Sequence, residues 1–305
     1  MTACKADWRN AIFALLALAL AGVARSQELE ARAYSPAPVG TRIVVAGVGS
    51  SEGAFVIDPA QPIHDVQTDV AFAFLGAGYV FDLWGRQTRV LVVAPYVQGD
   101  VTAESGGIPV AQDLHGFTDP RIKFSIGLAG APALSAAELA TAPRRTSIGI
   151  GLTILPPVGQ YDRTRLVNLG YHRWGFKPEI AVTHPAGPWT LEAIAGVWLY
   201  TDNDAYFPGN ARRSQASVSS LRGHLAYTFP GRSWLALDAT WFSGGRTRVD
   251  GVPSDDRQDN ARAGLTWSFP IGRRQSLKLS YNTGVSTERG ADYDTFTLAW
   301  QWVKY

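Results

Sequence analysis

Apolar and polar residues alternate along most of this chain, in runs of roughly ten residues separated by turn-forming segments. The clearest run is 293–303, where bulky residues share one face and small or polar residues share the other: Phe296, Leu298, Trp300 and Trp302 against Thr297, Ala299, Gln301 and Val303. Side chains on a strand point alternately to its two faces. A bulky apolar face that carries Trp is typical of a barrel strand in contact with lipid. The pattern therefore predicts a transmembrane strand.

The same alternation recurs about 12 times, an even number that suits a bacterial barrel. We therefore expect an all-β fold, a closed antiparallel transmembrane β-barrel. Its last strand should pair with its first, because an open sheet edge is not tolerated in hydrocarbon. The predicted strands are 41–52, 66–81, 88–101, 119–130, 146–157, 174–184, 189–201, 217–229, 234–246, 259–269, 276–287 and 293–303.

The connections between these runs alternate in length, which an all-β soluble sandwich would not explain. Outer-membrane barrels have short periplasmic turns and long external loops. The short connections are 82–87, 185–188, 230–233 and 270–275, and the long ones are 53–65, 102–118, 158–173, 202–216 and 247–258. One connection, 130–145, is long where a short one is expected. Its composition predicts a small helix on the periplasmic side.

The N-terminus has the features of an export signal. Lys5 and Arg9 precede an uncharged run from Ala11 to Val23, and Ala24 and Ser26 fit a cleavage site. The run is short for a membrane-spanning helix, which disfavours the alternative of an uncleaved anchor. We expect a signal peptide at 1–26, a periplasmic lead-in at 27–40 and the barrel at 41–305. Prolines keep the lead-in extended, and the barrel mouth is one place for it.

Removing residues 1–26 leaves 25 basic and 25 acidic residues and no cysteine, because Cys4 lies in the signal. Net charge thus gives no argument for binding to nucleic acid. Without cysteine there is no disulfide framework and no thiolate metal site, and zinc spacings and phosphate-binding glycine loops are also missing from the sequence. We expect no cofactor and no metal.

Charged residues on the inward faces of the predicted strands are the main candidates for a solute path, because a charge facing lipid at mid-membrane costs about 2–4 kcal/mol. A positive lumen would favour anionic solutes or orient phenolate-like ones. The alternative is an ion-pair network that makes a narrow barrel rigid. The candidates are Arg121, Lys123, Lys177, Glu179, Glu192, Arg222, Asp238, Arg262 and Lys278, with His224 nearby.

Aromatic side chains could line a path for aromatic solutes, but most fall on the lipid face. A girdle at the membrane interface is the expected role of Trp189, Trp241, Trp267, Trp300 and Trp302. Trp198 differs, because it shares the inward face of its strand with Glu192, and we count it in the solute path. The first three strands are apolar on both faces, so the lumen wall there should be apolar or covered by the N-terminal segment.

Two other kinds of site are weakly indicated. His64, His115 and His172 lie in predicted external loops, but single histidines in different loops are poor evidence for catalysis, and we expect no enzyme activity. The cluster at 202–204 (Asp-Asn-Asp) could bind calcium through oxygen atoms. It lacks the spaced ligands of a dedicated site, so a turn is the expected structure.

Several runs resemble the outer-membrane transporter family of the MetA pathway of phenol degradation, over essentially the whole chain after the signal. The resemblance implies a barrel in the bacterial outer membrane that passes small, often aromatic or hydrophobic compounds. It implies no catalytic residues. Its partners would be outer-membrane lipid and the solute, and we expect a monomer. The matching runs are Leu29 to Gly40 (LEARAYSPAPVG), Asp58-Pro59 with Pro62-Ile63, Asp119-Pro120-Arg121, Pro157 to Tyr161 (PVGQY), Leu166 to Glu179 (LVNLGYHRWGFKPE) and Thr201-Asp202-Asn203.

The C-terminus leaves two alternatives open. Tyr305 is a terminal aromatic residue, but it is out of phase with Phe296 to Trp302, and Lys304 occupies the in-phase position. Either a bulge shifts the register near Val303, or the strand ends there and Lys304 and Tyr305 lie in the periplasmic interface. We favour the second. For the chain as a whole, a channel is our expectation, with a non-conducting structural or surface-interaction barrel as the rival.

Overall fold

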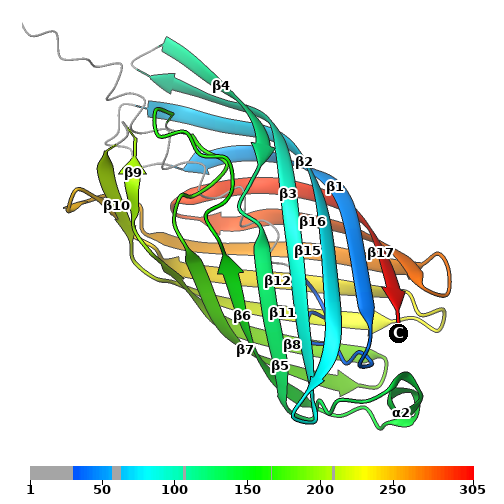
Figure 1. Ribbon diagram of the computed structural model, residues 1–305. Coiled ribbons are helices and arrows are strands. Elements are labelled where there is room, and N and C mark those ends of the chain that lie inside the picture. Colours follow the sequence, from blue (N-terminus) through cyan, green and yellow to red (C-terminus); the bar gives the residue numbers. More distant parts are fainter. Residues whose placement is uncertain (1–29, 57–62, 106–107, 166, 208–209) are drawn as a thin grey trace, which may run out of the picture.

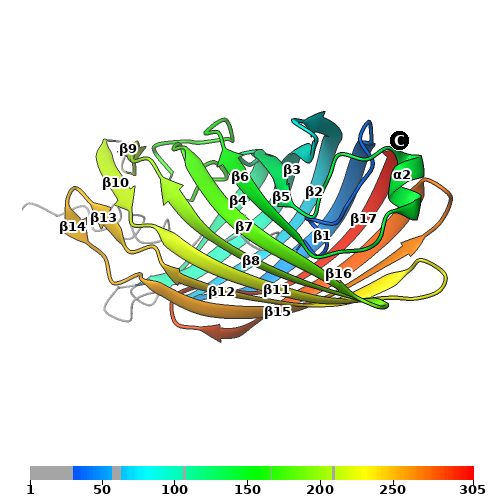
Figure 2. The same ribbon diagram turned by 90° about the horizontal axis from the view of Figure 1, so that it is seen from below.

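The protein is a closed antiparallel β-barrel of 12 strands, as the alternation predicts (Figures 1 and 2). The computed structural model describes residues 30–56, 63–105, 108–165, 167–207 and 210–305. The expected signal peptide lies outside these ranges. In chain order the barrel strands are β1 (Arg42–Val56), β2 (Ile63–Leu83), β3 (Arg86–Ser105), β5 (Arg121–Ala129), β6 (Ser147–Leu155), β7 (Gly175–Ala186), β8 (Trp189–Tyr200), β11 (Val218–Thr228), β12 (Trp234–Gly244), β15 (Gln258–Pro270), β16 (Gln275–Thr287) and β17 (Gly290–Lys304).

Strand β17 closes the barrel by pairing with β1 along its whole length. The pairing runs from Val56 opposite Gly290 to Arg42 opposite Lys304, with no shift of register. The predicted pairing of the last strand with the first is therefore confirmed. Our expectation that the strand stops at Val303 is wrong by one residue, and no bulge forms there. Lys304 continues the alternation of β17 and pairs with Arg42 of β1.

The fourth strand position is divided between two elements. Strand β4 (Ile108–Phe117) pairs with the external end of β3, from Tyr96 to Ser105. Strand β5 pairs with the periplasmic end of β3, from Thr88 to Val93. The chain between them, 118–120, includes Pro120, which has no N–H to donate. The prediction of a loop at 102–118 is wrong, because β3 continues outward and turns back as β4. The predicted start of the next strand at 119 is likewise two residues early.

Part of the external side forms a second small sheet. It contains β9 (Asn203–Tyr206), β10 (Ala211–Gln215), β13 (Thr247–Val249) and β14 (Val252–Pro253), in the order β14-β13-β10-β9. These strands lie within the segments 202–216 and 247–258, which we predicted as long connections outside the barrel strands. Cross-strand hydrogen bonds between the two loops explain the difference.

The opposite end of the barrel carries the short turns, the C-terminus and one small helix, α2 (Ala136–Thr141) (Figures 1 and 2). Ser135 and Glu138 form a capping box: the Ser135 hydroxyl accepts from the Glu138 N–H, and the Glu138 carboxylate accepts from the Ser135 N–H. The predicted small periplasmic helix is confirmed. Among the described residues, no helix is long and apolar enough to cross a membrane.

The outer wall of the barrel is apolar and ends at a row of carboxylates. Large apolar side chains such as Leu75, Leu237 and Trp267 project outward and are 46–63% exposed. Toward the external side, five exposed acidic residues stand in register on neighbouring strands: Asp294, Glu52, Asp69, Asp100 and Asp113. Because charges are costly in hydrocarbon, this row marks the outer limit of the lipid-facing band.

Candidate solute path

The described part of the N-terminal segment, 30–40, lies inside the barrel and crosses its lumen. Arg89 on β3 donates to the carbonyl oxygens of Ala33 and Ser35, at 2.8 and 3.1 Å. On the far side, Arg32 donates to the Thr228 hydroxyl at 3.4 Å and lies over the Trp234 ring. The segment is thus tied to β3 on one side of the lumen and to the neighbouring strands β11 and β12 on the other.

Tyr34 holds the middle of this segment against the opposite wall. Its hydroxyl donates to Glu179 Oε1 at 2.7 Å, and its backbone N–H donates to Glu192 Oε2 at 3.2 Å. Two glycines of β6 make room for this side chain, since a Cβ at Gly149 would collide with the ring and a Cβ at Gly151 with the hydroxyl. Burial, and then the charge of Glu179, raise the pKa of the Tyr34 phenol. The hydroxyl therefore keeps the proton that it donates.

Glu179 is the centre of an ion-pair cluster in the lumen. Its carboxylate is 2.6 Å from Lys123 Nζ, 2.5 Å from an Arg222 guanidinium nitrogen and 3.9 Å from Lys177 Nζ. These residues come from three strands, β5, β7 and β11. Because a buried carboxylate is stable only with partners of opposite charge or hydrogen-bond donors, the cluster fixes the relative positions of these strands.

A second polar group lies beside the first. His224 Nδ1 is 2.6 Å from Asp238 Oδ1, and the Thr266 hydroxyl donates to Asp238 Oδ2 at 2.7 Å. His224 and Asp238 are directly paired across β11 and β12. The alternation of these strands puts both residues inside, where Asp238 is held by His224 and Thr266.

A cavity of about 200 Å³ lies in the lumen above the Tyr34 contacts. One sector of its wall comes from the first three barrel strands and is apolar: Val45, Phe74, Leu91 and Val93. The remaining sector is largely polar. It carries five basic side chains and two carboxylates: Arg121, Lys123, Lys177, Arg222 and Lys278, with Glu30 and Glu179. Gly47 allows the Phe74 ring to lie flat on β1, since a Cβ there would collide with the ring. The predicted apolar lumen wall is confirmed.

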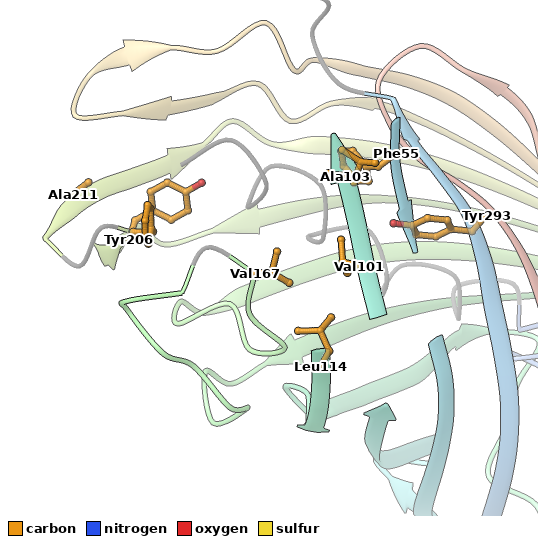
Figure 3. Close-up of a cluster of buried hydrophobic side chains, with 10 residues drawn as sticks. Phe55, Val101, Ala103, Leu114, Val167, Tyr206, Ala211 and Tyr293 are labelled. Carbon is orange, nitrogen blue, oxygen red and sulfur yellow. The ribbon is translucent and has the colours of Figure 1, made fainter. Parts of the chain in front are cut away.

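The external side of the lumen is capped by a buried apolar cluster (Figure 3). External segments contribute Val167, Tyr206 and Phe207, which pack against residues of the barrel wall. The wall residues come from strands on both sides of the closing pair β1 and β17: Phe55, Val66, Val101, Ala103, Leu114 and Tyr293. Apolar burial of this kind stabilises the inward-folded loops by roughly 25 cal/mol per Å² of area removed from water.

Asp119, at the break between β4 and β5, fastens the external loop 158–171 to the barrel. Its Oδ1 accepts from the Gly159 N–H at 2.7 Å, and its Oδ2 accepts from the Tyr171 N–H at 2.8 Å. A Cβ on Gly170 would collide with the backbone of Gly159, and a Cβ on Gly159 would collide with the backbone at Thr118 and Asp119. These residues lie within the runs that resemble the family, and their role is to hold the loop over the mouth.

We expect Asp119→Ala to release this loop. The variant leaves two backbone N–H groups without an acceptor, at a cost of about 1–3 kcal/mol each. Amide hydrogen exchange at Gly159 and Tyr171 should accelerate at least tenfold, because local opening becomes easier. The matched control is Asp162→Ala in the same loop, where the carboxylate is exposed and accepts from Thr164. Unchanged protection at Gly159 and Tyr171 in the Asp119 variant would contradict this role.

The structure places every predicted solute-path residue on the inner face. Seven of them line the cavity: Arg121, Lys123, Lys177, Glu179, Trp198, Arg222 and Lys278. Glu192, His224 and Asp238 lie nearer the periplasmic end, and Arg262 lies nearer the cap, where it donates to the Tyr293 carbonyl at 2.5 Å. Our reasoning missed Tyr34, Arg89 and Asp119 as functional residues. The motif runs that contain Tyr34 and Asp119 were the only signal for them.

The weaker candidates find ordinary structural partners. His172 stacks on Tyr161 with ring centroids 4.6 Å apart. Asp202 and Asp204 both pair with Arg212, at 2.6 and 3.5 Å. Among the described residues, no group of three or more His, Cys, Asp or Glu side chains could hold a metal ion. Trp189, Trp241 and Trp267 are more than 40% exposed on the outer wall, in the positions of a girdle.

Comparison with known proteins agrees with this architecture. Residues 48–300 match a family model described as "Putative MetA-pathway of phenol degradation". The chain belongs to this family. The match spans nearly the whole barrel, from β1 to β17, which confirms the resemblance seen in the sequence.

Solved structures share the fold at low sequence identity. An outer membrane channel from Pseudomonas putida is 20% identical, with a TM-score of 0.76 over 91% of this chain and 100% of that one. A deletion mutant of TodX, a monoaromatic hydrocarbon channel, is 11% identical, with a TM-score of 0.50 over 90% and 94% of the two chains. No curated protein sequence matches the chain. The barrel fold and its apolar outer wall place this family member in the bacterial outer membrane.

Proposed function

We propose that this protein is a gated channel that admits small apolar or aromatic compounds across the outer membrane. The observation that carries the proposal is a cavity of about 200 Å³ in the lumen, with segment 30–40 on one side and the apolar cap on the other. For comparison, an engineered apolar cavity of about 150 Å³ binds benzene. The cavity therefore has room for a single-ring compound.

The two obstructions differ from a packed protein core in a way that supports gating. Segment 30–40 is irregular and is held largely by hydrogen bonds, and the external segments that carry Val167, Tyr206 and Phe207 form the part of the cap that packs on the barrel wall. Neither belongs to the barrel ladder, so both can move while the barrel stays closed. Elements of this kind are the usual gates of channels and lids.

The family supports the class of solute. Its description names phenol degradation, and an aromatic solute suits a wall formed by Phe74, Leu91 and Val93. The strongest rival is a barrel that does not conduct at all and serves a structural or surface-interaction role. The obstructed lumen favours this rival as long as the segment and the cap are immobile.

Planar-bilayer recordings and liposome uptake separate the two functions. The mature chain, refolded into lipid, is expected to give brief, low-conductance openings. Benzyl alcohol should also enter liposomes that contain the protein faster than it enters protein-free liposomes. A variant lacking residues 30–40 should conduct several times more. Silence of both proteins in the bilayer, together with uptake equal to that of empty liposomes, would reject the channel.

A further inference from the structure

The cavity has two chemically different walls that meet along one line of the barrel. On β3 the inward side chains are Leu91 and Val93, and on the neighbouring β5 they are Lys123 and Arg121. The register pairs them directly: Leu91 lies opposite Lys123, and Val93 lies opposite Arg121. Directly opposed residues on neighbouring strands have Cβ atoms about 4.5–5.5 Å apart. An apolar surface and a cationic one are thus within the width of a single ring compound.

The ion pairs of the cluster do not use all of these cations. Lys123, Lys177 and Arg222 share the Glu179 carboxylate. Arg121, which lines the same cavity, forms no ion pair with any residue in the described ranges, whereas Lys278 is the cation that interacts most strongly with the Glu30 carboxylate. Lys278 Nζ also lies 5.8 Å from the centroid of the Trp234 ring. A basic side chain turned toward a cavity of low polarity favours an anion there.

Asn282 adds a third polar group to the same cavity. It is only 4% exposed, and its side-chain oxygen has no hydrogen-bond partner in the described structure. Because an unpaired buried polar atom is costly, such a group commonly has a ligand or water as its partner. Its amide can also turn its NH₂ group toward an acceptor.

We propose that the solute is an aromatic carboxylate, with its acid group at Arg121 and its ring on Val93, Leu91 and Phe74. This inference rests on the channel function proposed above and names its substrate class. A carboxylate accepts two parallel hydrogen bonds from a guanidinium group, which fixes the position of the ring as well as the charge. Lys278, on the other flank of the apolar sector, interacts with the Glu30 carboxylate, so Arg121 is the cation available to the acid group of the solute. A neutral ring of the same size meets only the apolar part of the site.

The periplasmic exit has the same sign of charge. A groove of about 240 Å³ at that end of the barrel is lined by Arg232, Arg273 and Arg274 and by no acidic residue among those described. An anion that leaves the cavity toward the periplasm thus moves toward positive charge. Local fields of one sign raise the concentration of the opposite ion and speed its passage.

The test compares benzoate, benzyl alcohol and acetate on the full mature chain, by calorimetric binding in detergent and by uptake into liposomes. Benzoate is expected to bind at least tenfold more tightly than either of the other two. Arg121→Gln should weaken benzoate binding about tenfold, as expected for the loss of a charged hydrogen-bonding partner, and leave benzyl alcohol almost unchanged. Lys304→Gln removes an exposed charge at the barrel end and serves as the control.

A second variant tests the apolar half of the site without a change of size. Val93→Thr should weaken the binding of both ring compounds and leave the binding of acetate unchanged. Equal affinity of the wild-type protein for benzoate and benzyl alcohol, or equal weakening of both by Arg121→Gln, would overturn the proposal while leaving a channel for neutral compounds intact. Selective binding of benzoate without uptake of any ring compound would instead uphold the site and reject the channel.

Discussion

Replacing Glu179 by alanine is expected to lower the stability of the barrel by about 3–5 kcal/mol, because it leaves buried cations without their carboxylate. Lys123, Lys177 and Arg222 all lie within 4 Å of Glu179 at present. The Arg222 side chain is 4% exposed and that of Lys177 is 2% exposed, so neither can turn to bulk water. Few single changes in a barrel wall should cost as much.

The measurement is the temperature at which the folded band converts to the unfolded one on a gel, with urea unfolding in lipid for the free energy. Glu52→Ala is the matched control, since it removes the same charge from an exposed position on the outer side of β1. Only the Glu179 variant should shift the transition substantially. A combined Glu179→Ala and Arg222→Ala change should recover part of the loss, because one of the uncompensated charges is removed. Equal shifts of the unfolding transition in Glu52→Ala and Glu179→Ala would show that the ion-pair cluster does not stabilise the barrel.

The faces of the strands were predictable because the period of a strand is two and a charge in lipid is costly. For this reason each candidate from Arg121 to Lys278 lies inside the barrel. Which of those charges meet was not predictable. Glu179, Lys123 and Arg222 come from β7, β5 and β11, and their contact depends on the stagger between strands that are not neighbours in sequence. A local pattern contains no information about that stagger.

The errors arose where local pattern and pairing disagree. The run 108–117 includes Pro109 and several polar residues, so it does not resemble a strand, yet pairing with the external end of β3 makes it one. The segment around Tyr34 has no alternation at all. Its place in the lumen follows from Arg89, Glu179 and Glu192, which lie far away in the sequence. Such contacts can be seen only when the barrel is closed.

Removing one oxygen atom, in Tyr34→Phe, is expected to open the channel on the periplasmic side more often. The ring still fits over Gly149 and Gly151, but the 2.7 Å hydrogen bond to Glu179 is lost. A hydrogen bond to a charged group contributes about 1.5–3 kcal/mol. If the segment leaves the lumen in the open state, the closed state alone loses this energy. The ratio of open to closed channels then rises by about ten- to a hundredfold.

Single-channel recordings measure this ratio directly, as the fraction of time spent open. Tyr79→Phe is the matched control, because Tyr79 is 43% exposed on the outer wall of β2 and makes no recorded hydrogen bond in the described structure. The size of the open-channel current should be the same in the wild-type protein and in Tyr34→Phe, since the residue changes the equilibrium and not the open path. A rise in open-channel current at constant open fraction would mean that Tyr34 narrows a standing pore. An unchanged record would place the gate elsewhere, with the apolar cap of Val167, Tyr206 and Phe207 as the remaining obstruction.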